Sequence, residues 1–232
     1  MTDLQAILDA GGPWQQARII GGQLLINGDC REVMAVLGGA YDAICADPPY
    51  GIGMDGGKVG KSEYAKKGWD SHAIDASPLL AAKVPTVMWG GNYFNVPPSD
   101  RWLVWDKKND PTTFADCELA WTNIPGAVRV FRWLWSGPYQ QVREKRYHPT
   151  QKPIALMEWC LGFLPDARTI LDPFAGSGTT AVACQRLGRQ SISIELDADY
   201  WAIMCRRVQE VVNNPPLFTP APPKPTQDKM DL

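Results

Sequence analysis

The stretch LDPFAGSGTTA, from Leu171 to Ala181, decides the fold class. It joins a short apolar strand to a helix that we expect to begin near Thr179, and the turn between them contains Gly176 and Gly178. The two glycines and Ala181 match the relaxed dinucleotide fingerprint GxGxxA. Because glycine has no side chain, a ligand can approach the backbone N–H groups at the start of the helix. The stretch therefore predicts a ligand site at the end of a parallel strand.

Glu195 strengthens this prediction. It lies 19 residues after Gly176, at the end of the next predicted strand, QSISIEL. A carboxylate at that place accepts hydrogen bonds from the hydroxyl groups of a ribose. We therefore expect an adenosine-type cofactor on a Rossmann-like sheet. The identity of the cofactor stays open at this point, and a simple strand-to-helix turn is the alternative interpretation.

Strands and helices alternate along the rest of the 232 residues. This alternation indicates an α/β protein with a mostly parallel central sheet and helices on both faces. We expect one domain over residues 1–212, a mobile loop over 51–76 and a disordered, proline-rich tail over 213–232. The predicted strands lie within 17–28 (two strands), 41–50, 86–91, 101–108, 127–137, 169–174 and 190–196, and the predicted helices within 4–12, 30–39, 77–85, 154–164, 178–188 and 198–212.

The overall composition limits the classes of function. A formal net charge of -2 gives no global attraction to a polyanion, so nucleic-acid binding would have to rest on local basic clusters. Six cysteines lie far apart without a CxxC pair, which predicts buried reduced thiols, and two histidines are too few for a zinc site. We therefore expect no metal. No apolar run reaches the length of about 18 residues that a membrane helix needs, so we expect a cytoplasmic protein without a membrane contact.

A second stretch, Asp47-Pro48-Pro49-Tyr50, follows the apolar run at residues 43–46. Neither proline has a backbone N–H group, so the pair cannot continue the sheet and instead holds the backbone in a fixed conformation. The stretch thus places an acid, a rigid carbonyl group and an aromatic ring at the end of a strand. Taken alone, it is explained equally well by a helix N-cap at Asp47 and a core aromatic at Tyr50.

Together, the two stretches resemble the S-adenosylmethionine-dependent amino-methyltransferases that modify exocyclic nitrogens of DNA bases. Their order is similar to the permuted β group of that family, in which a catalytic half (here about 18–140) precedes a cofactor half (about 146–212). The segments INGDCREVM (26–34) and RYHPTQKP (146–153) are similar to further motifs of the family. A nicotinamide dehydrogenase would explain the glycine turn, but it explains neither DPPY nor HPTQKP.

The resemblance implies that Asp47, Pro48, Pro49 and Tyr50 are the catalytic residues. An exocyclic amine is a poor nucleophile, because its lone pair is delocalised into the base. Asp47 and the carbonyl group of Pro48 would accept hydrogen bonds from the amine as positive charge develops on its nitrogen. The target base must leave the duplex to be reached, and Tyr50 would stack on the flipped ring.

The resemblance also implies how S-adenosylmethionine binds. Its methionine end would lie over residues 174–177 with Thr150 and Lys152 close by, its ribose would meet Glu195, and its adenine would lie near Asp29 and Cys30. On sequence alone, Lys152 is equally well explained as a solvated surface lysine. The expected cofactor-binding residues are Asp29, Cys30, Asp47, Thr150, Lys152, Asp172, Phe174, Ala175, Gly176, Ser177, Gly178, Thr179 and Glu195.

Two basic clusters are expected to contact the phosphates of double-stranded DNA, although each is equally well explained as a solvated face. The clusters are Lys58, Lys61, Lys66 and Lys67 in the first loop, and Arg143, Lys145 and Arg146 before His148. The glycine-rich segment 56–62 does not match a triphosphate-binding loop, because Asp55 stands where that motif requires glycine. The segment GGNYF (90–94) is either the rim of a site or a plain turn.

The resemblance implies a site-specific DNA methyltransferase of the kind found in restriction–modification systems. An aspartate before Pro-Pro-Tyr favours N6 of adenine over N4 of cytosine. Only the segment SGPYQQVREKRY separates Trp135 from His148, which leaves no room for the target-recognition insertion of many relatives. Sequence reading would then fall to short loops, to a second subunit or to another protein. We therefore expect a short recognition site or loose specificity, with a homodimer as one arrangement. The alternatives are a non-catalytic nucleic-acid-binding subunit of the same fold and an RNA substrate.

Overall fold

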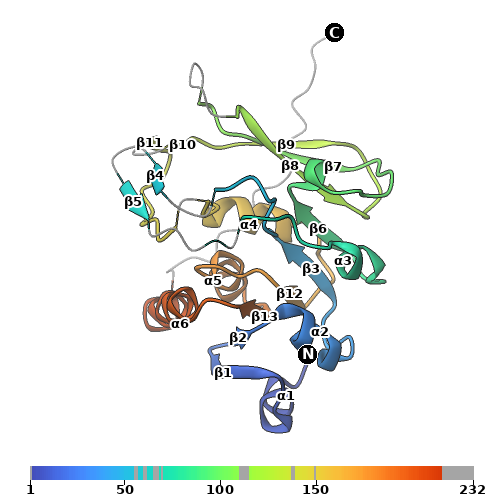
Figure 1. Cartoon of the computed structure of the whole chain (residues 1–232), viewed down its shortest axis with the longest axis vertical. Coiled ribbons are helices and arrows are strands. Elements are labelled where there is room, and N and C mark those ends of the chain that lie inside the picture. Colours follow the sequence, from blue (N-terminus) through green and yellow to red (C-terminus); the bar gives the residue numbers. More distant parts are fainter. Residues whose placement is uncertain are drawn as a thin grey trace.

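A nine-stranded mixed sheet runs through the chain with the strand order β1-β2-β13-β12-β3-β6-β8-β7-β9 (Figure 1). The structure is a computed structural model, and it describes residues 2–54, 57–59, 62–64, 68, 70–109, 115–136, 139–148 and 150–215. The strands β2, β13, β12, β3 and β6 are parallel to one another. β8 is antiparallel to both β6 and β7, and β1 is antiparallel to β2. The predicted α/β class with a mostly parallel centre is confirmed.

The strands of the main sheet are β1 (Trp14–Ile20), β2 (Gln23–Gly28), β3 (Ala43–Ala46), β6 (Thr86–Trp89), β7 (Trp102–Asp106), β8 (Cys117–Thr122), β9 (Arg129–Arg132), β12 (Thr169–Asp172) and β13 (Gln190–Glu195). Two short antiparallel ribbons accompany it, formed by β4 (Gly57–Val59) with β5 (Ser62–Tyr64), and by β10 (Trp135–Ser136) with β11 (Tyr139–Gln140). The helices are α1 (Leu4–Ala10), α2 (Cys30–Leu37), α3 (Ser77–Ala81), the short 3-10 helix η1 (Gly91–Tyr93), α4 (Ile154–Leu161), α5 (Thr179–Arg186) and α6 (Ala198–Asn213).

Helices cover both faces of the sheet, and the central strand β3 shows how. Its residues Ala43 and Cys45 pack in one cluster with buried residues of α4 and α5, while Ile44 and Ala46 pack in another with residues of α1, α2 and α3. Every residue of β3 and of β12 is buried. A parallel strand covered on both faces reads as a continuous apolar run rather than an alternating one, which is why these strands were visible in the sequence.

The strand connections lead to opposite sides of the sheet from the neighbouring strands β12 and β3. From β12 the chain passes through α5 to β13 on one side, whereas from β3 it passes through α3 to β6 on the other side, and the two helices lie on opposite faces. In open α/β sheets, ligands bind outside the carboxyl ends of the strands at such a switch point. Asp47 follows the end of β3, and Pro173 follows the end of β12. The fold therefore brings both sequence motifs to the place where a ligand is expected.

Several elements differ from the prediction. β8 was not predicted, because its sequence CELAWT combines a charged residue with apolar ones and lacks a clear alternation. The predicted strand at 127–137 is divided between β9 and β10, and β1 begins at Trp14 instead of Ala17. The region 51–76, predicted as an irregular loop, contains the ribbon β4–β5. Helix α6 reaches Asn213, the first residue of the predicted tail, and residues 216–232 lie outside the described part of the chain.

The two ends of this loop are tied together by Asp70. The Asp70 side chain is buried and accepts hydrogen bonds from the backbone N–H groups of Gly51 and Met54, both at 2.7 Å. An isolated β-bridge also joins Tyr50 to Ala73. A Cβ atom on Gly51 would lie 2.2 Å from the Ala73 nitrogen, so glycine is required at this close approach. The backbone just after the Asp47–Tyr50 stretch is thereby held in place.

The predictions on thiols, metals and membranes have separate outcomes. All six cysteines are free, and Cys45, Cys160, Cys184 and Cys205 are buried as expected, but Cys117 is exposed at the start of β8. Among the described residues, no group of three or more histidine, cysteine or acidic side chains is arranged to hold a metal ion. Within those residues, no helix is both long enough and apolar enough to cross a membrane.

Candidate active site

The Asp47 carboxylate is held by two side chains at the end of β3. The Lys152 ammonium donates hydrogen bonds to Oδ1 at 2.9 Å and to Oδ2 at 2.7 Å. The Tyr50 hydroxyl donates to Oδ1 at 2.6 Å. Each carboxylate oxygen can accept about two hydrogen bonds, so Oδ1 is saturated, while Oδ2 keeps one acceptor position that no described residue fills. The predicted catalytic residues Asp47 and Tyr50 are thus bonded directly to each other. Lys152, which the resemblance placed near the methionine end of the cofactor, is bonded to both oxygens of Asp47.

Lys152 continues into a chain of alternating charges. Its side chain is only 5% exposed, and its Nζ atom lies 3.0 Å from Oε2 of Glu118 on β8. The other oxygen of Glu118 lies 2.5 Å from Nζ of Lys107, which follows β7. The order is Asp47, Lys152, Glu118, Lys107, with opposite charges as neighbours. Lys152 is therefore not the solvated surface lysine that the sequence allowed, and its contacts with two carboxylates favour a role in holding Asp47.

The charges in this chain stabilise one another. Burial raises the pKa of the Asp47 carboxyl, and the Lys152 ammonium opposes that rise. Burial also raises the pKa of Glu118, but Lys152 and Lys107 outweigh it and hold this pKa at about 2. For Lys152, burial lowers the pKa, and the carboxylates of Asp47 and Glu118 more than compensate, so its pKa lies above the usual value. At neutral pH, Glu118 and Lys152 therefore carry their full charges.

The Tyr50 ring packs against the segment that follows β6. Its ring is stacked on that of Tyr93, with a centroid distance of 4.9 Å and an interplanar angle of 14°, and it meets the edge of Phe94 at 6.4 Å. Gly90 has a φ angle of 69°, and a Cβ atom there would lie 2.1 Å from Cε1 of Tyr50. Tyr93 itself is 47% exposed. The GGNYF segment is thus more than a plain turn, since it forms the support of the Tyr50 ring.

The glycine turn after β12 is closed by a carboxylate from the next strand. The Gly176 N–H donates to Oε2 of Glu195 at 2.7 Å, and the Asp197 N–H donates to Oε1 of the same side chain at 2.7 Å. Gly176 and Gly178 have φ angles of 52° and 81°, in the left-handed region that favours glycine. A Cβ atom on Gly178 would also lie 2.5 Å from Cγ of Met204. The predicted partners Gly176 and Glu195 are therefore in direct contact.

Two residues outside the predicted cofactor-binding set, Arg207 and Gln151, fix Ser177 in this turn. The buried Arg207 of α6 donates through Nη1 to the Ser177 carbonyl oxygen at 2.7 Å and to Oγ at 2.9 Å. Oγ of Ser177 in turn donates to Oε1 of Gln151 at 3.1 Å. His148 lies next to Gly176, and burial lowers its pKa to about 3, so it is neutral. The HPTQKP segment, through these residues, is part of the turn's framework, and Thr150 bonds to His148 at 3.2 Å.

Two carboxylates near this turn, the buried Asp172 and the half-buried Glu195, lack a cationic partner among the described residues, which distinguishes them from Asp47. Burial raises the pKa of Asp172 to about 7, and hydrogen bonds from Thr180 and the Phe174 N–H lower it only in part. Burial likewise raises the pKa of Glu195 to about 7, against two backbone hydrogen bonds. Such groups are suited to a ligand that brings hydrogen-bond donors and positive charge. S-adenosylmethionine has both, in its ribose hydroxyls, its amino group and its sulfonium, and so fits these residues.

Asp29 and Cys30 lie at the neighbouring strand end. In the parallel ladder of β13 and β2, Glu195 pairs with Asn27, so the residues after both strands leave the sheet at one edge. Asp29 caps α2 by accepting from the Arg31 N–H at 2.9 Å, and Arg31 also bonds its carboxylate through Nε at 3.0 Å. Burial raises the pKa of Cys30 to about 11, so its thiol is neutral. The predicted ribose and adenine residues are thus placed side by side.

The predicted DNA-contact residues are only partly within the described chain. Lys61, Lys66 and Lys67 lie outside it, and Lys58 lies on β4, of which only the backbone is described. The second cluster follows β11: Arg143 and Lys145 are exposed and Arg146 is half-buried. Nζ of Lys145 lies 5.0 Å from the ring centroid of Tyr147, and the Arg146 guanidinium lies 5.5 Å from that of Trp135.

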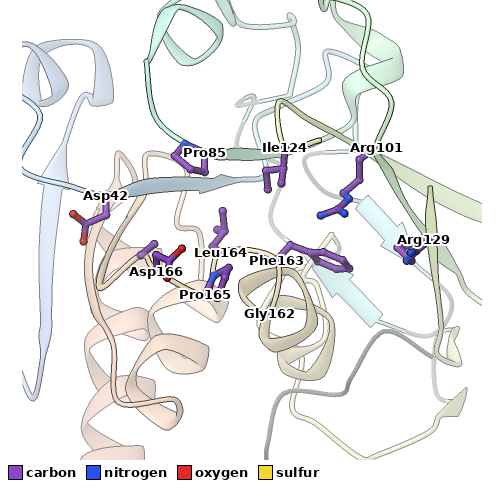
Figure 2. A pocket seen from close by; sticks show the side chains of 11 residues that line it. Asp42, Pro85, Arg101, Ile124, Arg129, Gly162, Phe163, Leu164, Pro165 and Asp166 are labelled. Atoms are coloured by element: carbon purple, nitrogen blue, oxygen red, sulfur yellow. The ribbon is translucent and has the colours of Figure 1, made fainter. Parts of the chain in front are cut away.

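A pocket at the other end of the strands, opposite the Asp47 carboxylate, does not belong to this site. Figure 2 shows Asp42 and Pro85, which come before β3 and β6, around the same hollow as Leu164, which follows α4. The guanidinium of Arg101 lies 5.2 Å from the Phe163 ring centroid and turns into the same hollow. These residues are at the amino ends of the strands, so they are separated from Asp47 by the height of the sheet. The pocket is lined by Asp42, Pro85, Arg101, Ile124, Arg129, Gly162, Phe163, Leu164, Pro165, Asp166 and Ala167.

Comparison with known protein families identifies the chain. The sequence model of the DNA methylase family of N6 and N4 type matches residues 88–206, which include HPTQKP and the glycine turn and begin after Asp47. The chain belongs to this family. A protein of Escherichia coli that carries the name methylase YubD is 35% identical over 204 residues, which cover 75% of this chain and 85% of that protein.

Further relatives are named type II methyltransferases. M2.DpnII of Streptococcus pneumoniae is 35% identical over 112 residues, which cover 46% of this chain but only 41% of the relative. M2.MboI of Moraxella bovis is 26% identical over 241 residues, covering 81% of this chain and 88% of the relative. The match to M2.MboI thus covers most of this chain and most of the relative, whereas the match to M2.DpnII covers less than half of either.

Two solved structures show the same fold. The complex of M1.HpyAVI with S-adenosylmethionine has a TM-score of 0.50 at 21% identity, covering 78% of this chain and 97% of that one. The PvuII DNA methyltransferase, whose title specifies cytosine N4, also has a TM-score of 0.50, at 13% identity, covering 86% of this chain and 94% of that one. At these identities the likeness concerns the fold, and it confirms the Rossmann-like methyltransferase architecture.

Proposed function

We propose that this chain transfers a methyl group from S-adenosylmethionine to the exocyclic amine of a DNA base. The observation that carries the proposal is the pairing at the switch point of the sheet. The Asp47 carboxylate, bonded by Lys152 and Tyr50, follows β3, and the glycine turn closed by Glu195 follows the adjacent strand β12. An acceptor group and a cofactor turn at neighbouring strand ends are what methyl transfer to an amine requires. Membership of the DNA methylase family supports the same activity.

The chemistry asked of Asp47 is electrostatic. An exocyclic amine gains positive charge as it is methylated, and a carboxylate fixed beside it stabilises that charge. Oδ2 of Asp47 has an acceptor position that none of the described residues uses, so we assign the hydrogen bond from the amine to this oxygen. The Pro48 carbonyl provides a second acceptor, which Pro49 helps to hold rigid. These groups orient the lone pair without having to act as strong bases.

The target base is proposed to stack on the aromatic pair of Tyr50 and Tyr93. A base must leave the duplex before a buried carboxylate can reach its amine, and an aromatic surface offsets part of that cost, at about 1–3 kcal/mol per stacked base. The Tyr50 ring lies against Tyr93 at 4.9 Å, and Tyr93 is the more exposed of the two. We keep Tyr50 as the catalytic aromatic residue and add Tyr93 as its outer neighbour.

The cofactor is proposed to bind along the carboxyl ends of β2, β13 and β12. When bound, S-adenosylmethionine supplies a methyl group attached to a positively charged sulfur, which is a good electrophile. Glu195 accepts hydrogen bonds from hydroxyl groups, and Asp172 faces the positively charged end. No metal is assigned a role. The remaining residues of the proposed cofactor site are Asp29, Cys30, Asp47, Thr150, Lys152, Phe174, Ala175, Gly176, Ser177, Gly178 and Thr179.

The substrate is proposed to be double-stranded DNA, met in the cytoplasm. Arg143, Lys145 and Arg146, together with the lysines at 58, 61, 66 and 67, are assigned to phosphate contacts, which carry little sequence information. With a short segment between Trp135 and His148, a homodimer is one way to read a longer site. The aspartate before Pro-Pro-Tyr favours N6 of adenine, and N4 of cytosine is the alternative.

A methyl-transfer assay with product analysis tests the proposal. The protein is incubated with DNA of mixed sequence and S-adenosylmethionine labelled in the methyl group, and the digested nucleosides are separated by mass spectrometry. We expect label in N6-methyladenine, whereas label in N4-methylcytosine would correct the base. The Asp47→Ala variant should largely keep cofactor binding in calorimetry and should transfer no methyl group. Transfer by this variant at the wild-type rate would refute the catalytic assignment, and DNA binding without transfer by the wild type would favour a non-catalytic subunit.

A further inference from the structure

Glu118 and Lys107 have no role in the proposed chemistry, yet they are connected to it. Lys152 lies between two carboxylates, 2.7 Å from Oδ2 of Asp47 and 3.0 Å from Oε2 of Glu118. Lys107 lies 2.5 Å from the second oxygen of Glu118. The four side chains come from four separate places in the sequence, and β8, which carries Glu118, was not predicted. The chain of contacts ends at Asp47, the carboxylate to which the proposed reaction assigns the amine.

The first consequence concerns position. A lysine side chain has four rotatable carbon links, so a contact with Asp47 alone would leave the ammonium group free to move around the carboxylate. Glu118 stands on β8, which is paired to β6 on one side and to β7 on the other. Lys107 continues from β7 and holds Glu118 from its far side. The ammonium group of Lys152 is thereby fixed from the sheet, and through it the orientation of Asp47.

The second consequence concerns charge. A lone ammonium 2.7 Å from Asp47 would cancel much of the negative potential that Asp47 offers to the amine. Glu118 shares this ammonium, so part of its positive charge is balanced on the side away from the substrate. The two acids and two ammonium groups together are neutral. Asp47 is then firmly held and still presents a negative oxygen where positive charge develops.

We infer that Glu118, supported by Lys107, is a positioning residue that acts on Asp47 through Lys152. This inference rests on the proposed methyl transfer and adds the residues that set its electrostatics. Glu118 touches neither the base nor the cofactor in this assignment. A purely structural ion network is the competing interpretation, because replacing one charge of a buried pair lowers stability whatever the function of the site.

The main test is Glu118→Gln, which removes the charge and keeps the shape. We expect kcat to fall about tenfold or more, since an electrostatic contribution to the transition state is lost. The dissociation constants for S-adenosylmethionine and for DNA should stay within about twofold of wild type, because binding of neither uses Glu118. Glu118→Asp, which restores the charge at a shorter reach, should recover part of the rate.

Glu158→Gln provides a matched control. Glu158 on α4 is also buried and ion-paired, with Oε1 3.0 Å from Nε of Arg186, which is not part of the site. Its replacement should lower the melting temperature by an amount similar to that of the Glu118 variant and leave kcat unchanged. If Glu118→Gln and Glu158→Gln both lose stability and both keep full kcat, the network is structural and the inference is overturned.

The pH profile of kcat gives a second readout, which reports the electrostatic link between Glu118 and Asp47. The charged groups facing Asp47 are Lys152 from the segment before α4, Glu118 from β8 and Asp172 from β12, with the Tyr50 hydroxyl as a further titratable neighbour. The negative charge of Glu118 raises the pKa of Asp47. In Glu118→Gln the acid limb of kcat should therefore move to lower pH, and an unmoved limb would contradict the inference. An inactive wild-type protein would instead remove the proposed function, and the inference with it.

Discussion

The acids at the carboxyl ends of β3 and of β12–β13 are held in opposite ways. Asp47, after β3, has an ammonium group within 2.7 Å. Asp172 and Glu195, on β12 and β13, accept from backbone N–H groups and, among the described residues, form no ion pair with a basic side chain. Asp172 is buried, and Asp47 and Glu195 are half-buried. The difference is that the protein itself supplies a cation to the Asp47 carboxylate, whereas the two cofactor-side carboxylates have none among the described residues.

Replacing Lys152 should have the largest effect on stability, because it removes the cation that distinguishes Asp47 from the other two acids. Lys152→Met leaves Asp47 and one oxygen of Glu118 buried without their shared partner, which typically costs about 3–5 kcal/mol. We expect the free energy of unfolding in urea to fall by about this amount at pH 8. The loss should shrink as the pH is lowered, because a protonated Asp47 no longer needs the cation. A constant loss at every pH would show that Lys152 acts by packing alone.

The cofactor-side carboxylates should make the stability of the cofactor-free protein depend on pH. Their folded-state pKa of about 7 lies above the usual values of 3.8 and 4.5. The stability that they contribute is therefore present below about pH 4 and is lost as the pH rises through about 7. We expect the cofactor-free protein to be more stable at pH 5.5 than at pH 8.

Asp172→Asn should make that dependence weaker. The amide carries no charge to desolvate, so the variant should be about 2 kcal/mol more stable than wild type at pH 8 and nearly equal to it near pH 4. Urea unfolding at both pH values measures the difference. Equal stability of variant and wild type at pH 8 would mean that Asp172 already has a compensating partner.

The smallest effect is expected at Asp29, the half-buried acid that follows β2. Asp29 caps α2 and pairs with Arg31, whose side chain is 83% exposed. Asparagine caps a helix about as well as aspartate, and exposed ion pairs contribute little. Asp29→Asn should leave the melting temperature unchanged, and cofactor affinity measured by calorimetry then reports the ligand contact alone. A clear drop in melting temperature would place Asp29 among the structurally required acids.

The parts of the site that the sequence revealed are those whose chemistry is local. The Gly176–Gly178 turn and the Asp47–Tyr50 stretch each follow a continuous apolar strand, and each contains residues with a conformational reason to be there. Glu195 was predicted at the right place because it ends the next strand. These features depend on a few neighbouring residues, so one sequence is enough to read them.

The parts that the sequence did not reveal depend on pairing between distant segments. Glu118 reads as an ordinary surface acid until β8 is placed beside β7. Gly90 reads as a turn residue until the Tyr50 ring is found against it. Arg207 lies on the buried side of a helix and gives no local sign that it bonds Ser177. Such roles arise from the sheet order and from helix packing, which no local pattern encodes.

Asp70, near the end of the first loop, is bonded to Gly51 and Met54 at its start. Gly51 and Met54 are fastened by the same carboxylate, so the position of Tyr50 is set before the chain continues into β4 and β5. A single buried carboxylate, 16 residues further along the chain than Met54, thus fixes the backbone on which Tyr50 stands. The position of Tyr50 therefore depends on a residue that no local motif around it contains.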